Sequence, residues 1–228
     1  MSQIKITLPD KSDRSFDSGI TPLEVAQSIG ERLAQDTVAA SINGKLVDAT
    51  TQITQDCELI LHTGSTNEGH DVLLHSTAHL MAQAVKSLWP NSQITIGPTI
   101  ENRFYYDFDI EETFSDDDLN KIENKMKDIA KEDLSVSRSE LDHDQAIKLF
   151  DKRGEKYKVE IINEIDSSDQ ISAYQQGDFI DLCRGPHVPS TGKIKYFKLL
   201  STSGAYWRGD EKNKMLQRIY GTVFSSKK

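Results

Sequence analysis

Two short residue pairs, far apart along the chain, constrain its fold more than any other feature. His75 and His79 have three residues between them, and Cys183 and His187 repeat that spacing more than a hundred residues later. These four side chains can act together only if a folded domain brings the two segments side by side. Once together, they would form either a metal site or a metal-free hydrolytic pocket.

A long helix is predicted for residues 71–89, where apolar side chains share one broad face before Pro90 ends the pattern. His75 and His79 fall on the opposite side of this helix. A lone histidine in a helix is usually a core group, but a pair outside the apolar face can hold one object between its rings. We therefore expect the pair to face solvent or a second layer across a cleft, in a functional role.

The second pair follows a predicted strand and flanks a Gly-Pro turn, so Cys183 and His187 can project into a pocket. Tetrahedral zinc is one candidate occupant, because it accepts histidine and cysteine ligands. In the metal-free alternative, histidine and lysine transfer protons near neutral pH and the thiol lines a wall. Three further candidate members each lie on a predicted strand: Tyr106 (103–109), Lys158 (158–162) and Asp181 (178–182).

The first part of the chain, residues 1–63, predicts a small mixed domain that begins with an alternating strand. Thr21 and Glu24 form a capping signal for a short helix. Asn43 and Gly44 supply the two positive φ values of a tight hairpin turn, and a closing strand follows. This order predicts a ubiquitin-like β-grasp. Because it contains no catalytic constellation, we expect a docking or appended module.

The second part, residues 64–228, predicts a larger α+β domain, joined to the first through a small polar linker at 63–69. Helical patterns at 119–129 and 144–150 alternate with short strands, which indicates helices against a largely antiparallel sheet. The sequence has no internal repeat, no glycine-rich phosphate loop and no nucleophile elbow. The four paired residues therefore remain its main chemical signal.

The net charge of −9 argues against generic nucleic-acid binding, but the charge is uneven. Residues 107–144 hold fourteen acidic and five basic side chains, which is typical of a solvated helical face. Residues 193–228 hold nine basic and two acidic side chains with aromatic residues between them. Such a segment can bind RNA or can be the basic rim of a final sheet. The candidate RNA-binding residues are Arg208, Lys212, Lys214 and Arg218.

Cysteine use and hydropathy indicate the cellular setting. The two cysteines, Cys57 and Cys183, are too few for a disulfide framework. No stretch approaches the roughly eighteen consecutive apolar residues of a membrane helix, and the N-terminus shows no signal-peptide pattern. We therefore expect a reduced, cytoplasmic protein that does not bind a membrane.

Four motifs together resemble the N-terminal half of the bacterial threonyl-tRNA synthetases. The histidine and cysteine motifs are shared with the editing domains of alanyl-tRNA synthetases, so these two indicate only the superfamily. The last motif, together with the β-grasp ahead of the domain, indicates the threonyl enzyme, and the resemblance spans the whole chain from its TGS-like module through its editing domain. The motifs are residues 75–80, 97–107, 181–189 and 204–222.

The resemblance implies that the chain hydrolyses serine wrongly attached to threonine tRNA and spares the threonyl ester. The implied catalytic residues are His75, Lys158 and His187, of which His75 and Lys158 would organise the water and the terminal ribose hydroxyl. Asp181 and Tyr106 would orient the seryl group. The wall facing the threonine methyl group would come from Cys183 with His187, and His79 would lie beside the substrate.

The same resemblance implies the cofactors and partners. Editing would need no cofactor, although zinc, if bound, would use His75, His79, Cys183 and His187. ATP and a further zinc ion would belong to the aminoacylation core, whose motifs are absent from this sequence, so the chain should not make threonyl-tRNA. The partner would be the 3′ acceptor end of threonine tRNA carrying serine, and the full-length enzyme would be a homodimer through other domains. A zinc-dependent hydrolase and a non-catalytic RNA-binding module are the alternative interpretations.

Overall fold

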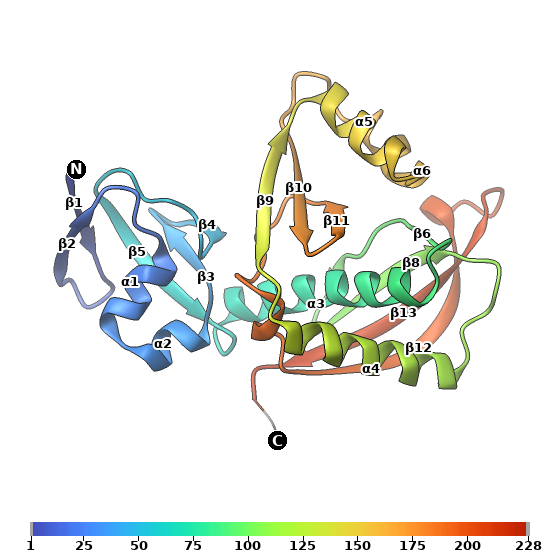
Figure 1. Ribbon diagram of the computed structural model, residues 1–228, viewed down its shortest axis with the longest axis horizontal. Coiled ribbons are helices and arrows are strands. Elements are labelled where there is room, and N and C mark those ends of the chain that lie inside the picture. The colour runs from blue at the N-terminus through green and yellow to red at the C-terminus, as the bar shows by residue number, and fades with distance from the viewer. Residues whose placement is uncertain (1, 227–228) are drawn as a thin grey trace.

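The computed structural model describes residues 2–226. Met1 of the first predicted domain, and Lys227 and Lys228 of the basic segment, lie outside the described residues. Figure 1 shows a small N-terminal unit at one end of a long central helix, with two further sheets arranged around that helix. Within residues 2–226, none of the helices combines the length and the apolar character needed to cross a membrane.

The N-terminal unit is a five-stranded sheet in the order β2-β1-β5-β3-β4, in which β1 and β5 are parallel. Thr21 and Glu24 form the predicted capping box, and Asn43 and Gly44 both adopt positive φ in the predicted hairpin turn. The β-grasp prediction is confirmed. Its elements are β1 (Gln3–Thr7), β2 (Asp13–Asp17), α1 (Pro22–Ile29), α2 (Glu31–Asp36), β3 (Thr37–Ile42), β4 (Lys45–Asp48) and β5 (Cys57–Thr63).

The central helix α3 (Asn67–Leu88) begins within the segment that the sequence predicted as a linker. Thr66 caps it by accepting a hydrogen bond from the backbone N–H of Gly69. A Cβ atom at Gly69 would lie 2.0 Å from the carbonyl oxygen of Thr63, the last residue of β5. Only glycine permits this approach, so the two units meet in a tight, ordered junction within the predicted linker at 63–69, whose ends belong to β5 and α3.

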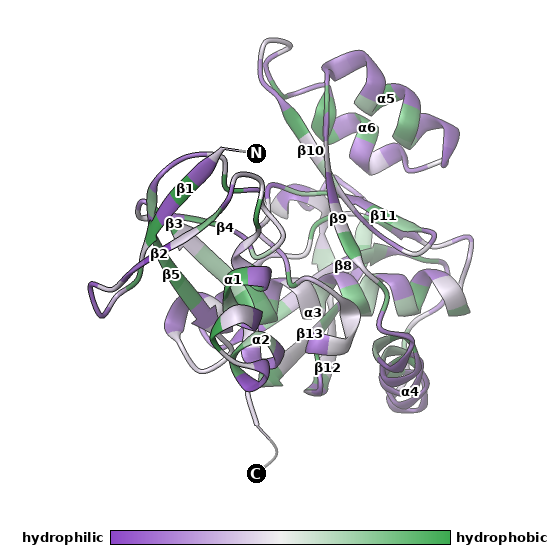
Figure 2. Cartoon of the chain, turned by 60° about the vertical axis from the view of Figure 1, so that its left-hand side comes forward, coloured by the Kyte–Doolittle hydropathy of each residue, from purple (hydrophilic) through white to green (hydrophobic). Residues whose placement is uncertain are grey.

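The largest sheet, in the order β12-β13-β8-β6, packs against α3 and α4. Buried side chains of α3 and α4 meet those of the sheet in one apolar core that includes Leu80, Phe108, Met126 and Ile219. In Figure 2 the visible part of α4 is mostly purple, which marks hydrophilic residues. The elements are β6 (Gln93–Ile94), β7 (Thr99–Ile100), β8 (Arg103–Asp109), α4 (Asp116–Glu132), β12 (Tyr196–Tyr206) and β13 (Met215–Phe224), with β7 paired to β8.

A third, smaller sheet in the order β11-β10-β9 carries the cysteine motif at its end. Phe150 and Ile162 of two helices pack on Ile171 and Ile180 of this sheet in a separate apolar cluster. Both sheets beyond the N-terminal unit are antiparallel, which confirms the α+β prediction. The elements are β9 (Val136–Leu141), α5 (His143–Lys152), α6 (Lys156–Ile162), β10 (Ile171–Gln176) and β11 (Phe179–Leu182), with short 3-10 turns at Thr191–Lys193 and Trp207–Gly209.

The strand predicted for residues 158–162 is wrong, because this segment belongs to helix α6. Its β-branched residues favour a strand locally. In the helix, however, Tyr157 and Ile161 share one face that packs on Trp207, while Lys158 and Ile162 share the face that turns inward. Burial on two sides at intervals of four residues outweighs the local preference.

Candidate functional site

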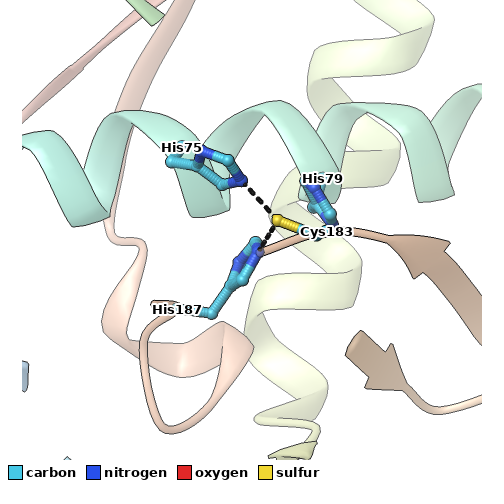
Figure 3. Close-up of side chains that lie close together, drawn as sticks. All are labelled: His75, His79, Cys183 and His187. Carbon is cyan, nitrogen blue, oxygen red and sulfur yellow. Dashed lines mark hydrogen bonds between the residues drawn. The ribbon is translucent and has the colours of Figure 1, made fainter. Parts of the chain in front are cut away.

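The two predicted pairs meet between α3 and the loop that follows β11 (Figure 3). His75 and His79 project from consecutive turns of α3, as the four-residue spacing predicts. The Sγ atom of Cys183 lies 2.9 Å from Nε2 of His75 and 3.2 Å from Nε2 of His187. One potential ligand atom from each of the four side chains lies within 4.8 Å of the others. We expected His75 and His79 to face solvent or a second layer across a cleft. The loop after β11 is that second layer.

The loop is held close to the sheet beneath it. The backbone N–H of Val188 donates to the Ser76 hydroxyl of α3, 3.1 Å away. Gly185 has φ of 72°, and a Cβ atom there would lie 1.9 Å from the hydroxyl oxygen of Tyr174. Glycine is therefore required in the turn both for its backbone conformation and for the close approach of the tyrosine.

Burial controls the protonation of this cluster. It lowers the pKa of His75, and it lowers the pKa of His79 and His187 further, because protonated rings in the cluster would also repel one another. Burial raises the pKa of the Cys183 thiol to about 12. At neutral pH the three imidazoles are therefore uncharged and can accept protons or bind a cation.

Beside this cluster lies a buried charged network that the sequence suggested only in part. The Nζ atom of Lys158 lies 2.5 Å from Asp181 and donates to the Tyr106 hydroxyl at 3.0 Å. Tyr106 in turn donates to the other oxygen of Asp181 at 2.6 Å. Lys158 also donates to the backbone carbonyl of Thr95, and His79 lies 3.6 Å from Asp181. Each charge in this network is paired, which allows it to be buried.

Lys158, rather than Lys156, is the lysine of the site. Only 3% of the Lys158 side chain is exposed, whereas 61% of the Lys156 side chain is exposed and its Nζ atom pairs with Asp109. In a helix, residues two apart point in different directions, so one of the two had to face away. Helix α6 therefore places Lys158 in the cavity and Lys156 at the surface.

The network and the cluster line one cavity of about 740 Å³. Thr95 contributes a carbonyl oxygen rather than its side chain, so its residue type carries no signal in the sequence. Arg138 and Arg184 also line the cavity and are cations that sequence reasoning missed. Of the predicted site residues, the following line it: His75, His79, Tyr106, Lys158, Asp181 and Cys183. His187 lies behind Cys183, and one side of the cavity is apolar, formed by Pro98, Ile161, Ile165 and Ile171.

The four His and Cys side chains also fit a metal ion. Ligand atoms around tetrahedral zinc lie at about 2.0 to 2.3 Å from the ion, so they are separated from one another by roughly 3.3 to 3.8 Å. The cluster falls near this range, and its imidazoles are neutral, as metal ligands must be. His75, His79, Cys183 and His187 could thus hold a metal, although four protein ligands would leave no open position for water.

The predicted RNA-binding residues lie away from the cavity, and three of the four already pair with carboxylates. Arg208 contacts Glu160 and Glu164. Lys214 lies 2.5 Å from Asp109, and Arg218 makes a two-pronged contact with Asp107. Lys212 is exposed in the turn between β12 and β13. The basic segment is therefore largely neutralised where it meets α6 and β8.

Two family models match this chain. Residues 4–63 match the TGS domain, and residues 171–220 match the threonyl and alanyl tRNA synthetase second additional domain. The threonine–tRNA ligases of Marinobacter nauticus, Carboxydothermus hydrogenoformans and Hahella chejuensis are 56%, 54% and 55% identical to it. Each alignment covers 98% of this chain.

The chain is homologous to the N-terminal part of threonine–tRNA ligase. It spans about a third of the length of the ligases that it matches, 35% in each of these three alignments. The TGS match ends at Thr63, the last residue of β5, and the second match begins at Ile171, the first residue of β10. The match to the second additional domain thus includes Asp181 and the cysteine motif.

Proposed function

We propose that this chain is the editing part of a threonine–tRNA ligase, which hydrolyses serine from threonine tRNA and leaves threonine attached. The observation that carries the proposal is the single cavity in which the His/Cys cluster meets the buried network of Lys158, Asp181 and Tyr106. The relatives are ligases for threonine, the amino acid that this reaction would leave attached. Threonine tRNA charged at its 3′ end would be the substrate.

The chemistry of the two amino acids explains why a second site is needed. Serine lacks one methyl group of threonine, and a missing methyl group in a binding pocket changes the free energy of binding by only about 1 to 3 kcal/mol. A rigid wall can exclude the larger threonine more effectively. Cys183, held from behind by His187, would form that wall. Asp181, fixed by Tyr106 and Lys158, would orient the seryl group.

Ester hydrolysis needs a positioned water and a group that stabilises negative charge. His75 is neutral at pH 7 because burial lowers its pKa, so it can accept a proton from water. Lys158 is a hydrogen-bond donor on the adjacent wall of the cavity and can stabilise a developing negative charge or hold the ribose hydroxyl. The two residues line the same cavity from different helices, α3 and α6.

The decisive experiment follows release of serine and threonine from charged threonine tRNA under single-turnover conditions at saturating protein. Serine release is expected to exceed threonine release by more than about 100-fold, because a rigid wall excludes the extra methyl group more effectively than a pocket detects its absence. His75→Ala should lower serine release by roughly 10²- to 10⁴-fold, because it removes a general base without opening a core cavity. Equal rates for serine and threonine would contradict the proposed sieve.

A zinc-dependent hydrolase of the same superfamily is the second candidate, favoured by the geometry of the four His and Cys side chains. A bound zinc ion would act as a Lewis acid toward the ester or a water only if one of the four protein ligands left its coordination shell. We expect activity without stoichiometric zinc, because four protein ligands would occupy all three histidines and close the coordination shell. Elemental analysis with activity measured before and after chelation tests this. One zinc per chain together with chelator-sensitive hydrolysis would favour the metal-dependent candidate.

Contact with the tRNA backbone through the basic segment is a further part of the proposal. Lys212 and Lys214 are exposed at the same end of the β12–β13 hairpin, and phosphate groups bind such cations with a strong salt dependence. Arg208, Lys214 and Arg218 would contribute only if phosphates displaced their present carboxylate partners. Lys212 is therefore the strongest candidate.

A further inference from the structure

The N-terminal β-grasp unit contacts the loop that carries Cys183 and His187 through one side chain. Asp48, the last residue of β4, accepts a hydrogen bond from the backbone N–H of His187 at 2.7 Å. Its second carboxylate oxygen accepts one from the Tyr174 hydroxyl at 2.8 Å. A residue of the first unit thus holds the loop that carries the second His/Cys pair.

Tyr174 extends this contact to the imidazole itself. The tyrosine lies on β10, is 3% exposed, and its ring centroid is 4.4 Å from that of His187. Its hydroxyl also lies against Gly185, where a Cβ atom would not fit. Asp48 and Tyr174 therefore fix the backbone and the ring of the same histidine, and that histidine contacts Cys183.

The chemistry suits a positioning role. A carboxylate that accepts from a backbone N–H and a phenol makes charge-assisted hydrogen bonds, which are stronger and more directional than neutral ones. Asp48 does not line the cavity. It would act on the reaction through the position of His187 and, through it, of Cys183.

We propose that Asp48 is a positioning residue for the editing reaction, so that the β-grasp unit is a structural part of the deacylase site. This inference rests on the proposed function. It would add a role in the site to the docking or appended module that the sequence predicts for the first unit. No local signal marks Asp48, because its partners lie 126 and 139 residues further along the chain.

The interface offers a matched control. Lys193 also joins the two units, since its Nζ atom donates to the backbone carbonyls of Ala34 and Gln35 at 2.7 and 2.8 Å. Lys193 lines a different pocket and does not touch the loop between Cys183 and His187. Loss of Lys193 weakens the contact between the units without altering the loop directly.

The test compares Asp48→Ala, Asp48→Asn and Lys193→Ala in single-turnover hydrolysis of seryl-tRNA, with protein concentration varied to separate the maximal rate from the half-saturating concentration. Asp48→Ala should lower the maximal rate by about 10- to 100-fold with little change in half-saturation, as expected for misplaced catalytic groups. Asp48→Asn keeps one acceptor for the His187 N–H and should lose less. Lys193→Ala should stay within about twofold of the unaltered chain.

Two results would overturn the inference: a normal maximal rate in Asp48→Ala, or equal losses in Asp48→Ala and Lys193→Ala. If Asp48→Ala fails to fold, Asp48→Asn decides, because a rate and melting temperature equal to those of Lys193→Ala would exclude a specific role. The altered chains are compared by thermal unfolding to confirm that they are folded at the assay temperature.

A second measurement separates this inference from the proposed function. The amide signal of His187, observed by NMR in the full chain, reports its hydrogen bond to Asp48 whether or not the protein hydrolyses any ester. In Asp48→Ala that amide should shift upfield and exchange about tenfold faster, and in Lys193→Ala it should not. If the unaltered chain releases neither amino acid, the proposed function fails, and an unchanged His187 amide in Asp48→Ala would then also exclude the positioning role.

Discussion

Lys158 illustrates how a single residue depends on its surroundings for both stability and chemistry. Its ammonium group is almost completely buried and has three polar partners, of which Asp181 carries the opposite charge. In water such a pair contributes little, but in the interior each member makes burial of the other tolerable. The same enclosure holds the ammonium group at the cavity wall, where a bound ester would replace one of its three partners.

Replacing Lys158 should therefore affect folding and hydrolysis together. Lys158→Ala leaves Asp181 buried without a cation, and we expect a loss of about 3 to 5 kcal/mol in the free energy of unfolding, along with most of the hydrolysis. Lys156→Ala, two residues away on the outer face of α6, should cost less than about 1 kcal/mol. Urea unfolding of both altered chains measures the difference. Similar losses in the two would show that Asp181 does not depend on Lys158.

At the scale of elements, the β12–β13 hairpin combines a basic sequence with mostly satisfied charges. Arg218 stacks over Tyr105, with 3.8 Å from its guanidinium carbon to the ring centroid, while it pairs with Asp107. Lys214 lies beside Asp109. Such pairs stabilise the packing of the hairpin on β8 and leave less positive charge for phosphates than the composition of the segment implies.

The salt dependence of tRNA binding should reflect this difference. Lys212→Ala should reduce the slope of log affinity against log salt concentration by about one unit, the value for one lost phosphate contact. Lys214→Ala should reduce it less, because Asp109 already offsets its charge. Binding of threonine tRNA across a salt series measures both slopes, with the maximal rate of hydrolysis unchanged. If neither slope changes, the hairpin does not contact the tRNA backbone.

At the scale of the whole molecule, the sequence predicted what local signals encode. The strand at 103–109 was predicted with its observed bounds, and the hairpin turn at Asn43 was confirmed. The two His/Cys pairs have the same spacing, and their four side chains can form one site only if the fold brings them together. The sequence therefore predicted that the two pairs meet. The helix α6 was missed because packing against Trp207 outweighs its β-branched residues.

Contacts between distant segments had no such signal. The strand β9 is mostly exposed and polar, so its residues show little alternation, and its pairing with β10 depends on the sheet as a whole. In the sequence, nothing distinguishes Asp48 from other aspartates. Only the fold brings its carboxylate to the backbone N–H of His187. Most residues that line the cavity were therefore predicted from the sequence, whereas the contacts that hold them in place were not.

The two units share apolar contacts at their junction, although the N-terminal unit also has a buried cluster of its own, so we expect them to unfold together. Val38 and Ala39 of β3 belong to the same buried cluster as Val72 and Leu73 of α3. We expect one cooperative transition in calorimetry, with equal van't Hoff and calorimetric enthalpies. Two separate transitions would show that the β-grasp unit is stabilised independently of the rest.

The contact between Gly69 and Thr63 has a practical consequence for anyone who divides this protein. Polar, glycine-containing segments are the usual places to cut a chain or to insert another one. Here that segment is pressed against the end of a strand, where even a methyl group would collide with backbone. A break between residues 63 and 69 would expose the shared apolar surface on both pieces, and an inserted sequence would push Asp48 away from its histidine. Surface loops elsewhere, such as the turn at Asp10 and Lys11, are the safer positions for a tag or a fusion.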